Sequence, residues 1–195
     1  MANLTRADLW SLEQYAEQQR PAFRAQVMAH KKNREVCIGE NARLCFEDEI
    51  TIRYQIQEML RVERIFEAEG IQEELDSYNP LLPEGQNLKA TFMLEYDDID
   101  ERKIMLQNLK GIERQIWAQV GERPRIVPIA DEDMERENDE KTSSVHFLRY
   151  EFSADDIAAL RAGEPLTMGI DNPHIQPNRV QIDDPVRSTL IADFS

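Results

Sequence analysis

FEDEITIRYQIQEMLRVERIFEAEGI, residues 46–71, is the longest uninterrupted helical pattern in the chain. At about 100° per residue, four polar side chains of this stretch fall in one narrow arc of a helical wheel: Arg53, Gln57, Arg61 and Arg64. Apolar residues occupy most of the remaining circumference, whereas a surface helix usually has a narrower apolar stripe. We therefore predict a helix that ends at a C-cap at Gly70 and is covered on more than one side.

Two carboxylates fall among the apolar positions of this predicted helix. Glu58 neighbours Tyr54 and Val62 on the wheel, and Glu63 neighbours Ile56. Because an unpaired buried charge is costly, each carboxylate needs an ionic partner, a proton or a metal. A salt-bridge network is the simpler interpretation, and a site for a metal or for proton transfer is the alternative. The two carboxylates point about 140° apart, so a metal would need ligands from other elements.

The chain has 195 residues, a net charge of −15 and 41% hydrophobic residues, which suits a single α+β domain with a real core. Such acidity argues against nucleic acid or an anionic membrane as a partner, because both attract basic surfaces. No apolar run approaches the roughly 18 residues of a membrane helix. The first ten residues contain no apolar signal region, so we expect a cytoplasmic protein.

The two cysteines stand in a predicted β-hairpin, Glu35 to Phe46. Cys37 and Cys45 both have apolar neighbours in the sequence and do not form a CxxC motif. We predict that both are buried and reduced. A redox pair across the hairpin is the alternative.

The sequence HKKNR, from His30 to Arg34, is the one dense basic cluster in this acidic protein. It follows a predicted helix, and cations are stabilised near a helix C-terminus. A site for an anion or an acidic partner is the sharper alternative. Together with arginines of the long helix, the cluster supplies our candidate contacts for a partner or an anion: Lys31, Lys32, Arg34, Arg53, Arg61 and Arg64.

The second half of the chain has a different pattern, and the breaker-rich loop at residues 79–86 is a possible boundary within the domain. We expect residues 1–85 to be mainly helical with one hairpin. We expect residues 86–195 to form a mostly antiparallel sheet packed with two helices.

Individual elements of this half carry further predictions. One helix is expected to begin near Asp98 and to end at Gly121, and residues 186–191 are expected to form the last strand. Residues 144–152 alternate as a strand in which His146 shares one face with apolar side chains. A half-buried histidine with satisfied hydrogen bonds is the commoner outcome there, and a metal ligand is the alternative.

Two long blocks resemble a bacterial family known only as a domain of unknown function. The first is HKKNREVCIGENARLCFEDEITIRYQIQEMLRVERIFEAEGIQEELDSYNPLLP, residues 30–83, and the second is EYDDIDERKIMLQNLKGIE, residues 95–113. Genes of that family often neighbour those for rubrerythrin and an iron–sulfur oxidoreductase. The resemblance implies an accessory role in peroxide or redox defence, with one of these two proteins as the partner. It supplies no catalytic residues, so whether the protein is an enzyme stays open.

Two hypotheses follow for the function. The first is a non-enzymatic accessory protein that docks a redox or iron–sulfur protein through its acidic surface. The second is a small metal-dependent enzyme or sensor. Its candidate ligands are Glu58, Glu63, His30 and His146, a set of carboxylates and imidazoles that would suit iron, manganese or zinc.

Overall fold

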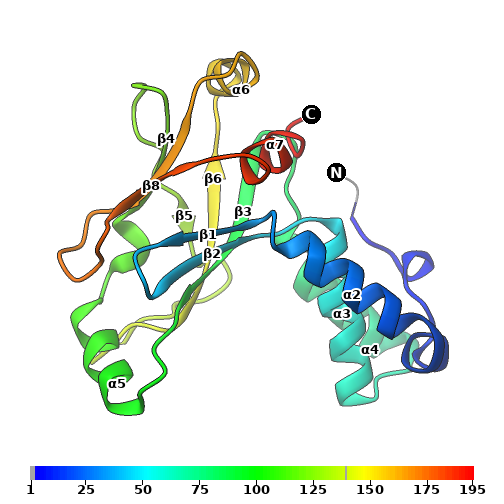
Figure 1. Ribbon diagram of the computed structural model, residues 1–195. Coiled ribbons are helices and arrows are strands. Elements are labelled where there is room, and N and C mark those ends of the chain that lie inside the picture. Colours follow the sequence, from blue (N-terminus) through cyan, green and yellow to red (C-terminus); the bar gives the residue numbers. More distant parts are fainter. Residues whose placement is uncertain (1–2, 139) are drawn as a thin grey trace.

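A computed structural model describes residues 3–138 and 140–195 of the chain (Figure 1). Helices dominate the N-terminal part and antiparallel sheets follow it, so the predicted α+β class is confirmed. Among the described residues, no helix is long and apolar enough to cross a membrane.

The N-terminal helices pack side by side at one end of the molecule (Figure 1). Their bounds are α1 Leu12–Gln14, α2 Arg20–Lys31, α3 Glu49–Glu63 and α4 Ala68–Tyr78, with short turns at η1 Arg6–Asp8, η2 Tyr15–Gln19 and η3 Asn79–Leu81. The π-helical turn η2 joins α1 to α2, and Pro21 lies in the first turn of α2, where its missing N–H is tolerated.

Helix α3 is shorter than the sequence pattern indicated. It begins at a capping box in which the Asp48 carboxylate accepts a hydrogen bond from the Thr51 N–H at 3.0 Å. It ends at Glu63 because Arg64 adopts a left-handed conformation, with φ of 59°. Gly70 lies inside α4 rather than at a C-cap, so the prediction of one helix up to Gly70 is wrong.

The strands form two antiparallel sheets. The larger sheet has the order β1-β2-β3-β6-β5, with bounds β1 Glu35–Ile38, β2 Ala42–Phe46, β3 Asn87–Leu94, β6 Val145–Glu151 and β5 Ile129–Ala130. The smaller sheet has the order β4-β7-β8, with bounds β4 Ile116–Val120, β7 Leu166–Ile170 and β8 Arg179–Ile182. Strands β1 and β2 are the predicted hairpin.

Two predicted elements of the second half are wrong. Helix α5, Ile99–Asn108, is shorter than predicted. Gly111 turns the chain with φ of 73°, and residues 116–120 form β4 instead of helix. A spacing of four residues keeps side chains on one face in a strand as well as in a helix, which explains the mistaken pattern. Residues 186–191 form helix α7 rather than a strand, because a short apolar run does not distinguish the two.

The main core lies between the two sheets and is also covered by α5 Ile99–Asn108, α6 Ala154–Arg161 and α7 Val186–Ile191. The N-terminal helices have their own apolar clusters, centred on Ile56 with Leu75 and on Tyr15 with Phe23. The larger sheet therefore buries one face in the main core, and its other face lies beside the helices.

Candidate functional site

Glu58 belongs to an ion-pair network between α2, α3 and η2. Its carboxylate accepts hydrogen bonds from Arg20 Nε at 2.7 Å, from the Tyr15 hydroxyl at 2.7 Å and from Arg61 Nη2 at 3.1 Å. The Arg20 guanidinium, supported by Tyr15 and Arg61 and opposed by burial, lowers the pKa of Glu58 to about 2. Glu58 thus has the ionic partners that the simpler interpretation requires.

Glu63 is exposed, so its predicted burial is wrong. Its wheel neighbour Ile56 is buried inside α3, but α3 ends at Glu63, so the helix does not continue past this side chain and leaves it exposed. Phe66, three residues beyond it, is 71% exposed.

His146 is fully buried on β6, more deeply than predicted, and both ring nitrogens are engaged. Nδ1 lies 2.6 Å from an Asp131 carboxylate oxygen, and Nε2 lies 2.9 Å from the Thr142 hydroxyl. The second Asp131 oxygen accepts the Phe147 N–H at 2.9 Å. This network fixes the chain after β5 against the larger sheet.

The basic cluster is divided between a buried and a surface part. His30 Nε2 lies 2.5 Å from the Asp48 carboxylate. Arg34 is 2% exposed and donates to the Phe46 carbonyl at 2.9 Å and to the Asp193 carboxylate at 3.3 Å. Burial raises the pKa of Asp193, although Arg34 opposes the shift. Because Arg34 is enclosed, it is not a surface contact for a partner.

The other candidate contacts have different environments. The Arg53 guanidinium lies 4.1 Å from the centre of the Trp10 ring. Arg61 is bound to Glu58, whereas Lys32 and Arg64 are exposed and Lys31 is half-buried. A partner contact through these residues stays a prediction.

The structure does not bring the four proposed metal ligands together. Glu58, His30 and His146 each have a separate set of bonding partners, and Glu63 points from the end of α3. In the described part of the chain, no group of three or more His, Cys, Asp or Glu residues is placed to hold a metal ion.

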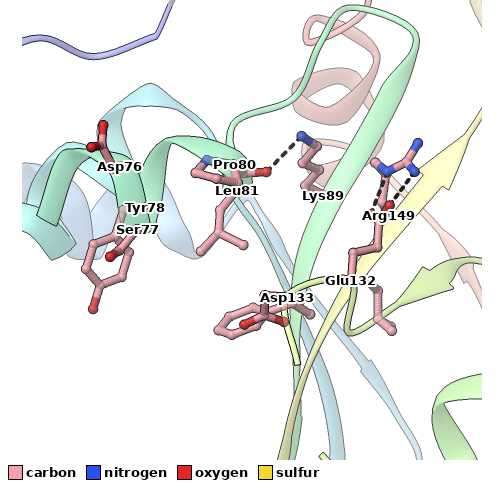
Figure 2. Close-up of a pocket in the computed structure, with 11 residues that line it drawn as sticks. Asp76, Ser77, Tyr78, Pro80, Leu81, Lys89, Glu132, Asp133 and Arg149 are labelled. Carbon is pink, nitrogen blue, oxygen red and sulfur yellow. Dashed lines mark hydrogen bonds and ion pairs between the residues drawn. The ribbon is translucent and has the colours of Figure 1, made fainter. Parts of the chain in front are cut away.

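Two cavities lie on the face of the larger sheet that is turned away from the main core, and together they form what we call the groove (Figure 2 shows the larger one). It comprises adjoining cavities of about 630 and 270 Å³, which share Tyr78, Leu81 and Phe147. Strand alternation explains its floor, because the odd-numbered residues of β3 and β6 point away from the core: Lys89, Thr91, Met93, Phe147 and Arg149.

The two walls of the larger cavity come from distant parts of the sequence. Tyr78 and Leu81, at the end of α4 and in η3, lie on one side, and Glu132 and Asp133 lie on the other (Figure 2). The second wall follows Asp131, so the His146 network holds it in place.

Both cations in the floor of the larger cavity have internal partners. Lys89 Nζ donates to the Pro80 carbonyl at 2.8 Å, and Arg149 makes two bonds to Glu132 at 2.7 and 2.8 Å (Figure 2). The hydrogen-bonded ion pair lowers the pKa of Glu132 and raises the pKa of Arg149. Both side chains therefore keep their charge over a wider pH range.

Glu47 is the distinctive polar group of the smaller cavity. One carboxylate oxygen accepts the Thr91 hydroxyl and the other accepts the Thr51 hydroxyl, both at 2.6 Å. Within the described residues, no cation lies at ion-pair distance from this carboxylate. Lys31 lines the same cavity.

Cys45 also lines the smaller cavity, whereas Cys37 is exposed, so the prediction that both cysteines are buried is wrong for Cys37. Both point to the outer face of the hairpin, where β1 is an edge strand and leaves Cys37 uncovered. Burial, with the nearby Glu35 and Glu47, raises the pKa of the Cys45 thiol to about 12. Cys45 is therefore a poor nucleophile at neutral pH.

The groove was not predicted from the sequence. The alternation of polar and apolar residues in β3 does indicate an outer face, but the second wall depends on a contact between segments far apart in the chain. Glu47 and Thr51 stand four residues apart, a spacing that contains no information about Thr91 on another strand.

Residues 3–194 match the sequence pattern of a family described as "Protein of unknown function (DUF3501)". The chain belongs to this family. The resemblance found in residues 30–83 and 95–113 is thereby confirmed. The chain is also similar to a solved structure from Burkholderia pseudomallei K96243, described as a novel protein of unknown function, with 49% identity, full coverage of both chains and a TM-score of 0.92. No curated protein matches the chain.

Proposed function

We propose that this protein is a non-enzymatic accessory protein and that the groove is its contact surface for a protein partner. The observation that carries the proposal is that Tyr78, Leu81 and Phe147 line both cavities of the groove and so stand at their junction. Aromatic and aliphatic side chains that stay accessible between polar walls are typical of sites where partners insert an anchor residue.

The partner is a redox protein, rubrerythrin or an iron–sulfur oxidoreductase, and the role is in peroxide or redox defence. This part of the proposal is supported by the sequence resemblance and by the acidic charge of the chain, which favours partners with a basic surface. The raised pKa of Cys45 favours docking over thiol chemistry in the groove.

Calorimetric titration of the purified protein against rubrerythrin and the iron–sulfur oxidoreductase of the same organism tests the proposal. Phe147→Ala should weaken binding about tenfold, because it removes an aromatic side chain from the junction. Ile104→Ala is the matched control, since Ile104 is 57% exposed on α5, outside the groove. Equal affinities for the two variants and the wild type would show that the groove is not the contact surface.

The metal-dependent alternative predicts a different result. Protein purified without chelators would contain stoichiometric iron, manganese or zinc, and Glu58→Gln would lose that metal. Elemental analysis of the two proteins separates this alternative from the docking proposal.

A further inference from the structure

We propose that the groove receives a partner segment in which an apolar side chain stands next to a lysine or arginine, and that this base binds Glu47. The inference rests on the proposed function, because it names the chemistry of the segment that would occupy the same groove. Two features of the groove support it. One is the distribution of paired and unpaired charges, and the other is the position of the apolar junction formed by Tyr78, Leu81 and Phe147.

Among the described residues that line the larger cavity, both cations already have partners in the same chain. Lys89 is held by the Pro80 carbonyl and lies 3.6 Å from the Glu84 carboxylate. Arg149 binds Glu132 and also Glu151. The floor cations are thus neutralised by carboxylates of the same chain, and these walls favour a cationic ligand over an anionic one.

The rims of the larger cavity add to this negative character. Asp133 pairs with Arg136, which also lies 3.6 Å from Asp131, so two carboxylates share one guanidinium. Asp76 accepts a hydrogen bond from the Gln72 amide at 2.8 Å and has no ion pair among the described residues. A basic segment that approached the groove would meet an excess of carboxylates.

Glu47 is the groove carboxylate that is oriented to accept a direct hydrogen bond from a ligand. The hydroxyls of Thr51 and Thr91 fix the orientation of both oxygens, and each oxygen keeps a further acceptor position. Among the described residues each Glu47 oxygen accepts one hydrogen bond, so its remaining acceptor position is available to an incoming N–H donor. A charge-assisted bond from an ammonium or guanidinium group satisfies them.

The apolar junction lies beside this carboxylate. Tyr78, Leu81 and Phe147 line both cavities, and Phe147 pairs in the sheet with Thr91, whose hydroxyl donates to Glu47. A segment with neighbouring apolar and basic residues can therefore place the first at the junction and the second at Glu47.

Replacing Lys31 tests whether the ligand is acidic or basic, because Lys31 lines the smaller cavity together with Glu47. An acidic ligand would bind Lys31 and would lose affinity when it is replaced. A basic ligand would be repelled by Lys31 and would gain affinity. Gln55, Thr51 and Thr91, which also line this cavity, are uncharged at neutral pH.

NMR titration with two capped peptides, Gly-Lys-Phe-Lys-Gly and Gly-Glu-Phe-Glu-Gly, tests the proposal on the full chain. The lysine peptide should shift the signals of Tyr78, Leu81 and Phe147, and the glutamate peptide should not. Glu47→Gln should weaken binding of the lysine peptide about fivefold, and Lys31→Gln should strengthen it. Glu122→Gln removes the same charge from an exposed position outside the groove and should leave affinity unchanged.

The outcomes separate this inference from the proposed function. Preferential binding of the glutamate peptide, no binding of the lysine peptide, or an affinity that does not depend on Glu47 would overturn the inference. If Phe147→Ala still weakened binding of the redox partner, the groove would stand as the contact surface with a different ligand chemistry. If Phe147→Ala left partner binding unchanged, the proposed function itself would fail. Thermal melts of every variant exclude loss of folding as the cause.

Discussion

Arg34 and Asp193 form an ion pair between residues 159 positions apart in the chain, and both side chains are almost completely buried. Arg34 also donates to the carbonyls of Phe46 and Glu47, where β2 leads into α3. A single guanidinium therefore joins the segment that follows α7 to the connection between the larger sheet and the N-terminal helices.

Replacing Arg34 should destabilise the protein strongly. Arg34→Met would leave the Asp193 carboxylate buried without its cation, and we expect a loss of about 3–5 kcal/mol in the free energy of unfolding. Asp193→Asn keeps an acceptor for the guanidinium and should cost less. Urea unfolding measures both variants, with Arg24→Met on the exposed side of α2 as the control. Equal losses for Arg34→Met and Arg24→Met would contradict the importance of this pair.

The Glu58 network should make stability depend on acid pH. The folded-state pKa of about 2 lies below the ordinary value of 4.5, so the folded protein favours the ionised carboxylate. Its stabilising contribution is present above pH 4.5 and is lost as the pH falls from 4.5 toward 2. We expect a contribution of about 1 kcal/mol, allowing for solvent around Arg20. Unfolding of Glu58→Gln should show a weaker pH dependence across this window than unfolding of the wild type, and identical profiles would exclude Glu58 as the source.

Glu63→Ala should have almost no effect on stability. The side chain is exposed at the end of α3, and substitutions at such positions usually change the free energy of unfolding by about 0.5 kcal/mol or less. Glu58→Ala, on the same helix, should be clearly destabilising because it leaves Arg20 and Tyr15 without their acceptor. A thermal melt of Glu63→Ala that fell as far as that of Glu58→Ala would show that Glu63 has a buried partner.

His146→Ala should loosen one wall of the groove. It removes one of the partners of Asp131 and leaves a cavity in a fully buried position, at a cost of about 2–4 kcal/mol. Thr142→Val removes one hydrogen bond at nearly constant volume and should cost about 1 kcal/mol. Hydrogen exchange should rise at residues 131–136 in His146→Ala more than in Thr142→Val, and unchanged exchange there would contradict a role of His146 in holding this wall.

The two cysteines should react at very different rates with a thiol reagent at neutral pH. Cys37 is exposed, whereas Cys45 is 9% exposed and its thiol has a pKa raised to about 12. Rapid alkylation and mass spectrometry should label Cys37 in the folded protein and both cysteines after unfolding.

The strand register also opposes a disulfide between them. Cys37 faces Arg43, and Cys45 faces Glu35, so the cysteines are diagonal neighbours. Diagonal pairs are roughly 7–8 Å apart, beyond the Cα separation of about 4.4–6.8 Å that a disulfide allows. A stoichiometric bridge in protein from rapidly alkylated cells would overturn this prediction.

The sequence predicted correctly those elements whose conformation is set by their own residues. The turn around Gly39 identified the hairpin, and alternation identified β3 and β6. The predictions failed where a pattern fitted two conformations, as for Ile116 and Val120 in β4. The predicted end of the long helix was also wrong, because Arg64 ends α3 in a left-handed conformation. Glycine usually marks such a position in a sequence, and this position has an arginine instead.

The candidate site was less predictable than the fold. The helical wheel identified Glu58 as a carboxylate that needs partners, but two of those partners, Tyr15 and Arg20, come from a different helical segment. Glu47 was not predicted as a site residue, because its hydrogen bond comes from Thr91, 44 positions away in the sequence. Contacts of this kind are set by strand pairing and helix packing, and a single sequence does not encode them locally.

The separate cores of the helices and the sheets have a consequence for the order of events during synthesis. The apolar clusters of the N-terminal helices contain residues from Leu4 to Leu82 only. We therefore expect this part to become protease-resistant on the ribosome before the sheets exist. Asp193 is synthesised 159 residues after Arg34, so the charge of Arg34 would stay hydrated until Asp193 has been made. Proteolysis of ribosome-bound chains stalled after residue 130 checks this order, and complete digestion of the helices would refute it.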